Sequence, residues 1–171
     1  MTECSRISVC SWAATLLALR SGLTLNPMKP AGRDVVRRLA ATADVVVANL
    51  PDSALQAMGL DYPSLVAVKP DVILTSVSAF GAAGPYSEKV GFDGIGQAMS
   101  GSMYLSGQPG QPTKSYVPWV DFTTALSATV GTLAALMARQ QNGRGQEVKG
   151  SLLASALTIA NPTLIEQALT V

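Results

Sequence analysis

The sequence predicts an α/β protein in which helices flank a parallel sheet. Two short, continuous apolar runs, Val45–Ala48 and Val72–Val77, have the composition of buried strands, and segments with helical apolar spacing lie between them. Strands that alternate with helices usually pair in parallel. The chain has 171 residues, of which 48% are apolar and 13% are charged, and this is enough for one domain with a buried core.

The first half of the chain supplies most of this alternation. Pro30 suits the first turn of a helix, and the apolar residues that follow it recur at helical spacing (Val35, Val36, Leu39 and Ala40). After the first strand, the pattern predicts helices at Ala54–Met58 and Tyr62–Val68, the second strand, a loop at Ser78–Val90, a helix at Phe92–Met99 and a loop at Gly107–Pro118.

A long helix without charge is expected to follow Asp121 and to end at Asn142 and Gly143, which suit a left-handed cap. Gln146–Lys149 is then predicted to form a short strand. Ser151 is expected to cap a last helix that runs from Leu152 to about Ala160.

Two apolar segments raise the question of a membrane. Phe122–Ala138 approaches spanning length, but its hydroxyl and glycine residues are poor lipid-facing material, so a buried core helix is expected. Val9–Leu19 lies behind Arg6 as in a secretion signal, but no convincing cleavage site follows, so export is not expected.

Charge and cysteine content narrow the classes of function. The net charge is +1 and basic residues do not cluster, so neither nucleic acid nor an anionic membrane is an expected partner. Cys4 and Cys10 form no C-x-x-C pair, and the chain has no histidine, so we expect no metal site and a reducing, cytoplasmic setting. Histidine-dependent proton relays within the chain are excluded.

Asp121 is the leading candidate for a catalytic residue. A carboxylate at a helix start is stabilised by the helix dipole and by unpaired backbone N–H groups, which favours the ionised, nucleophilic form. The alternative is an ordinary helix-capping aspartate.

The residues around Asp121 also resemble a known family. After it come an apolar helix ending in ALMAR, then NGRGQEV and SLLASAL, and before it stand KPAGRDVVRRLAATADVVVANL, ALQAMGLDYPSL, KPDVILTSVSAFGAAGPY and GFDGIGQAMSG. In this order they resemble the family III coenzyme A transferases, the group of formyl-CoA transferase, carnitine CoA-transferase and alpha-methylacyl-CoA racemase. The resemblance implies a partial Rossmann-like sheet, as in the large domain of that family.

The resemblance implies that Asp121 attacks an acyl-CoA and carries CoA as an aspartyl thioester before passing it to a carboxylic acid. It also implies a set of residues that contact coenzyme A, namely Leu25, Asn26, Pro27, Met28, Asn49, Leu50, Pro51, Val90, Gly91, Phe92 and Asp93. Loops at strand ends are where open parallel sheets bind ligands.

Some positions depart from the family or separate its branches. Members often have a basic residue where Met28 stands and an arginine where Ala57 stands, which weakens the phosphate contacts. Racemases place a histidine at the position of Phe92, so phenylalanine favours transfer over racemisation. Asp93 is either an active-site acid or the cap of the helix that follows it.

Other residues have simpler interpretations. Gly94, Gly96 and Gly101 follow no strand, so they indicate close packing rather than a dinucleotide site. Arg139 and Arg144 are expected to be solvated helix-end charges. Tyr116 and Trp119 are expected to pack, with an acyl pocket as the alternative.

Residues 1–22 do not resemble the family, so we expect an atypical leader at 1–22 and the central part of a large domain at 23–171. Family members form interlocked homodimers, so a second copy or a complementing chain is an expected partner, beside acyl-CoA and a carboxylic acid. The alternatives to a transferase are an inactive truncated remnant that acts at most as a binding module, and a racemase relative. The sequence does not name the acyl donor or acceptor.

Overall fold

The computed structural model describes residues 22–170. The expected leader, its two cysteines and the apolar stretch Val9–Leu19 therefore lie outside the described residues, except for Gly22. The elements are α1 (Pro30–Thr42), β1 (Val45–Ala48), α2 (Asp52–Met58), α3 (Tyr62–Val66), β2 (Ile73–Ser78), α4 (Asp93–Met99), α5 (Ser102–Leu105), α6 (Trp119–Asn142), β3 (Glu147–Ser151) and α7 (Leu152–Thr170).

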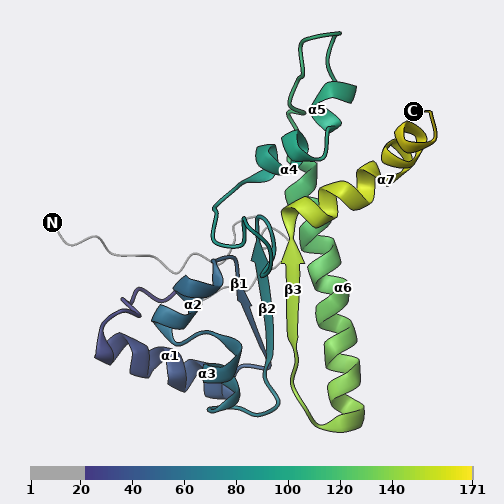
Figure 1. Ribbon diagram of the computed structural model, residues 1–171. Helices are drawn as coiled ribbons and strands as arrows, with labels where there is room; N and C mark the ends of the chain where they lie inside the picture. The colour runs from purple at the N-terminus through teal and green to yellow at the C-terminus, as the bar shows by residue number, and fades with distance from the viewer. Residues whose placement is uncertain (1–21, 171) are drawn as a thin grey trace, which may run out of the picture. The chain divides into compact units, whose positions relative to one another are not determined.

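The strands form one sheet in the order β1-β2-β3, as Figure 1 shows. β1 and β2 are parallel, with Val45 opposite Ile73 and Ala48 opposite Ser76. β3 runs in the same direction, because Gly145 N donates to Pro70 O (3.3 Å) and Leu74 N donates to Gln146 O (3.0 Å) further along both chains. The predicted α/β class with a parallel sheet is confirmed.

The described chain divides into two compact units. Unit 1 contains the residues up to Ser76 together with Gly131–Val148, and unit 2 contains Val77–Val130 together with the residues from Lys149 onward. β2, β3 and α6 contribute residues to both units.

In unit 1, helices cover both faces of β2. Leu74 of β2 faces a core cluster with Ala40 of α1 and Leu65 of α3. The next residue, Thr75, points to the other face, where its hydroxyl lies 2.6 Å from that of Thr132 in α6. This alternation follows from the two-residue period of a strand, and it explains why β2 is buried on both faces.

In unit 2, the core cluster contains Ala79, Val120, Leu152 and Ala156, with Trp119 packed against it. The sequence predicted that the last helix ends near Ala160, but α7 continues to Thr170 with Pro162 inside it. Pro162 removes one backbone donor from the helix, which nevertheless continues past it. The hydroxyl of Thr163 donates to Ala160 O (2.7 Å).

Two expectations for α6 are wrong. The helix begins at Trp119, because the carbonyl of Pro118 already accepts a bond from Phe122 N (3.3 Å), so Asp121 lies within the first turn rather than before it. The helix is also not a buried core helix. Small or β-branched side chains form its buried face, and larger ones are exposed (Phe122, Leu126, Val130, Leu133 and Met137).

Apolar residues occur all round α6, so the sequence carries no signal for the side that packs. Among the helices of residues 22–170, α6 alone is long and apolar enough to cross a membrane, and 22% of its most apolar window is buried. Its end agrees with the prediction, since Gly143 has φ 68° and donates to Arg139 O (2.8 Å).

Candidate active site

Asp121 lies in the first turn of α6, half-buried, between the buried residue Val120 and the exposed Phe122. The helix starts here because Pro118 cannot continue an upstream helix and the first-turn N–H groups find acceptors outside α6. Unit 2 therefore presents the carboxyl group of Asp121 at the edge of its core.

The acceptor for two of those N–H groups is Asp93, at the start of α4. Its Oδ2 accepts hydrogen bonds from Val120 N (2.8 Å) and Asp121 N (3.2 Å), and the residue is only 5% exposed. Asp93 thus caps the first turn of α6, and its role as an active-site acid stays a prediction.

Gln97 holds Asp93 in place. Its Nε2 donates to Asp93 Oδ1 (2.5 Å), and its Oε1 accepts from the backbone N of Ser115 (2.8 Å). The side chain is 1% exposed, so all these bonds are shielded from water. Gln97 is not among the residues predicted from the sequence, although its spacing of four residues from Asp93 on one helix was a usable signal.

The electrostatics of Asp121 differ from the sequence expectation. Burial raises the pKa of Asp121 most, the neighbouring carboxylate of Asp93 raises it further, and Lys114 lowers it in part. Two N–H groups of the first turn, those of Val120 and Asp121, are already bound to Asp93. The surroundings of Asp121 as a whole therefore oppose its ionised form, whereas the sequence led us to expect an environment that favours it.

Close packing explains two of the three glycines in this region. A Cβ on Gly96 would lie 2.8 Å from Val120 Cγ1, and one on Gly94 would lie 3.3 Å from Lys114 Cε. Gly101 is different: its φ of 78° is left-handed, and a Cβ there would meet nothing within 4 Å. The packing interpretation is correct for Gly94 and Gly96 and wrong for Gly101.

The residues expected to contact coenzyme A fall into separate places. Val90, Gly91 and Phe92 precede Asp93 in unit 2, and the side chains of Val90 and Phe92 are 75% and 79% exposed. Leu25–Met28 lie before α1 and Asn49–Pro51 follow β1, both in unit 1.

In unit 1, the segment before α1 is a tight turn. Asn26 Oδ1 accepts from Met28 N (2.9 Å) and Asn26 O accepts from Lys29 N (3.2 Å). Met28 also lines a shallow hollow together with Pro30, Arg33, Asp34 and Arg37. Arg33 Nη2 donates to Ala57 O (2.6 Å), so a guanidinium lies beside the position where the family often has an arginine.

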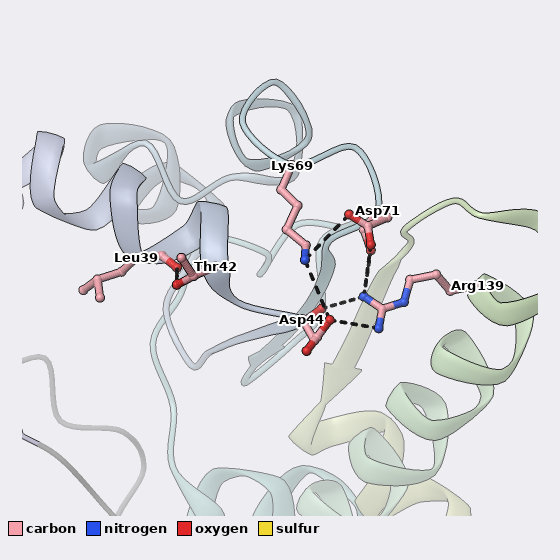
Figure 2. Close-up of polar contacts among 6 residues, drawn as sticks. All are labelled: Leu39, Thr42, Asp44, Lys69, Asp71 and Arg139. Atoms are coloured by element: carbon pink, nitrogen blue, oxygen red, sulfur yellow. Dashed lines mark hydrogen bonds and ion pairs between the residues drawn. The ribbon is translucent and has the colours of Figure 1, made fainter.

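A second polar cluster corrects the prediction for Arg139. Figure 2 shows its guanidinium between Asp44 and Asp71, at 3.1 Å and 3.5 Å, with Lys69 at 3.7 Å from each of the two aspartates. Its side chain is 18% exposed. Arg139 is thus an ion-paired residue of unit 1 and not a solvated charge, whereas Arg144 is exposed as expected.

The two aromatic residues before Asp121 also differ from each other. Trp119 packs against the core of unit 2, as expected, while Tyr116 is 99% exposed. Among residues 22–170, no group of three histidine, cysteine or acidic side chains is placed to hold a metal ion.

The profile of the family described as CoA-transferase family III matches residues 12–171, a range that begins within the segment expected to be a leader. A succinate–glutarate CoA-transferase from Agrobacterium fabrum is 42% identical over 125 residues, 72% of this chain and 31% of that protein. The beta subunit of a succinyl-CoA–L-malate CoA-transferase from Chloroflexus aurantiacus is 35% identical over 156 residues, 90% of this chain and 38% of that one.

A solved structure has the same fold. The crystal structure of a CAIB/BAIF family protein from Brucella suis superposes with a TM-score of 0.78 at 37% identity, over 84% of this chain and 38% of that chain. The chain thus spans 31% to 38% of the length of these relatives. Because the family profile covers most of the sequence, the chain belongs to CoA-transferase family III.

Proposed function

We propose that this protein moves coenzyme A from an acyl-CoA to a carboxylic acid, with Asp121 as the nucleophile. The observation that carries the proposal is a half-buried carboxylate, in the first turn of α6, in a member of CoA-transferase family III. A nucleophile at the edge of a core is shielded from bulk water on one side and open to substrate on the other.

The reaction divides one acyl transfer into several easier steps. A carboxylate oxygen of Asp121 attacks the thioester carbonyl, the C–S bond breaks, and CoA leaves as a thiolate from a mixed anhydride. The thiolate then attacks the aspartyl carbonyl, which releases the first acid and leaves an aspartyl-CoA thioester. The acceptor carboxylate attacks this thioester in the same way, and the returning thiolate takes the new acyl group and frees Asp121.

The segments Leu25–Met28 and Asn49–Pro51 of unit 1, and Val90–Asp93 of unit 2, are our candidates for contacts with coenzyme A. Arg33 adds a positive charge near the first of them. Its guanidinium is fixed by the carbonyl of Ala57, and a fixed guanidinium is well suited to pair with a phosphate. Arg33 therefore offsets the missing arginine at position 57.

Dicarboxylic acids are the substrates to test first. The named relatives transfer CoA between succinate and glutarate or from succinyl-CoA to malate. Transfer is favoured over racemisation because Phe92 has no group that can exchange a proton.

We also propose a second polypeptide as partner, either another copy or a complementing chain, since one relative is named as a subunit. A cytoplasmic location stays a prediction.

The direct test is to incubate the protein with succinyl-CoA, digest it and search by mass spectrometry for CoA linked to the peptide that contains Asp121. We expect an adduct that hydroxylamine removes, and none in Asp121→Asn, whose turnover should fall by at least roughly 10³-fold. Asp61→Asn in unit 1 is the matched control. A folded protein that forms no adduct, alone or with a complementing chain, would instead be a binding remnant.

A further inference from the structure

The loop before α6 places Lys114 near the start of both α4 and α6. The backbone N of Ser115 is bound by the buried Gln97, and this bond fixes the preceding residue, Lys114. Lys114 Nζ donates to Ser115 O (2.9 Å) and lies 3.8 Å from Asp93 Oδ1. Its side chain passes over Gly94, where any Cβ would stand 3.3 Å from Lys114 Cε.

Two carboxylates share this corner of unit 2. Asp93 is buried and bonds the backbone N of Asp121 itself, so the two acidic residues are direct neighbours. Two ionised carboxylates that share a partly buried site repel each other, and a nearby cation lowers the energy of the state in which both are ionised. Lys114 is in position to supply that cation, while 46% of its side chain stays exposed.

We propose that Lys114 is a positioning residue for the Asp121 nucleophile, and that its ammonium group, held 3.8 Å from Asp93 Oδ1, offsets the negative charge gathered beside Asp121. The inference rests on the proposed function, because it assigns Lys114 a part in keeping that nucleophile reactive. The bonds to the first turn of α6 hold Asp93 in place beside Asp121, so the compensating positive charge has to come from a third residue.

The charges that act on Asp121 agree with this role. Within residues 22–170, Asp93 from α4 raises the pKa of Asp121 and Lys114 from the loop lowers it, on top of the larger increase that burial causes. Without Lys114 the pKa of Asp121 therefore rises further. The fraction of ionised Asp121 falls most at pH values near its pKa and recovers as the pH rises further.

The test is a carbon-13 NMR titration of the Asp121 carboxyl group in the full chain. We expect Lys114→Met to move the midpoint to higher pH and Lys114→Arg to restore it. Lys89→Met, which removes a lysine stacked on Tyr86 (4.3 Å), should leave the midpoint unchanged. If the methionine variant does not fold, Lys114→Gln carries the same expectation.

An unchanged midpoint in a folded Lys114→Met or Lys114→Gln protein overturns the proposal, as does an equal shift in Lys89→Met. This readout does not need substrate, so it separates the role of Lys114 from the proposed function. If the midpoint moves but no CoA adduct forms, Lys114 tunes Asp121 and the proposed nucleophile is wrong. In an active protein, the Lys114→Met variant should form adduct more slowly at low pH, with the difference shrinking as the pH rises.

Discussion

At the residue scale, Asp93 has two effects that one substitution can test. Its hydrogen bonds stabilise the start of α6, and its carboxylate raises the pKa of Asp121. In Asp93→Asn the side-chain oxygen can still accept from the N–H groups of α6, but the amide nitrogen then faces Gln97 Nε2. We expect a loss of about 2 kcal/mol in the free energy of unfolding, because bonds to a charged acceptor are replaced by weaker or clashing ones. Chemical denaturation measures this loss, and Asp61→Asn serves as the control.

The same substitution should make Asp121 more acidic. The carboxylate of Asp93 raises the pKa of Asp121, so its removal lowers that pKa, and the pH profile of adduct formation should move toward lower pH. A residue with a purely structural role would reduce the rate at every pH without moving the profile. That outcome would reject the electrostatic coupling.

Asp121 itself should lower the free energy of unfolding at neutral pH. Its pKa in the folded protein lies above its ordinary value of 3.8, so the folded state holds the proton more tightly than the unfolded chain does. Stability from this group is present below pH 3.8 and is lost as the pH rises through the folded pKa. Asp121→Asn should therefore unfold at a higher temperature than the original protein at pH 7, with a smaller difference in acid. Thermal melts at several pH values test this, and a pH-independent difference would contradict it.

At the element scale, the contact between α4 and α6 depends on Gly96. A methyl group there would lie 2.8 Å from Val120 Cγ1, inside a helix–helix contact that cannot easily open because Asp93 ties the same two helices together. Gly96→Ala should cost about 1–3 kcal/mol through overpacking. Gly94→Ala is the matched control, since its methyl group meets only the side chain of Lys114 and no residue of another helix. Equal costs for both would show that helix packing is not the cause.

The ion-pair cluster in unit 1 gives another element-scale prediction. Arg139 ties α6 to the residues just before β1 and β2, through Asp44 and the side chain and carbonyl of Asp71 (Figure 2). Arg139→Met should lower the free energy of unfolding by about 1–2 kcal/mol, because two carboxylates lose a common partner. The deficit should shrink in high salt, while Arg144→Met should change nothing. A deficit that salt leaves unaltered would indicate lost packing instead.

At the scale of the whole molecule, the sequence was most informative where a local pattern decides the structure. The strands and α1 follow from apolar runs and from Pro30, and the end of α6 follows from Gly143. The site was predicted only in part: Asp121 stands out as an acid near a helix start, but its environment depends on Gln97 and Lys114, which long-range contacts bring to it. Sequence periodicity also gave no way to find the exposed side of α6.

That exposed side leads to a prediction about association. Within unit 2, three apolar residues recur at four-residue spacing on α6: Phe122, Leu126 and Val130, which are 43%, 68% and 66% exposed. Exposure of such an apolar stripe to water is unfavourable, so contact with another surface would lower the free energy. We expect the protein to self-associate as concentration rises, and Leu126→Glu to shift it toward monomer, since burial of a charge opposes the contact. Sedimentation velocity over a range of concentrations measures the change. Ser127→Glu adds the same charge at the next, already polar position, so an equal shift in both variants would show that net charge, not the apolar stripe, controls association.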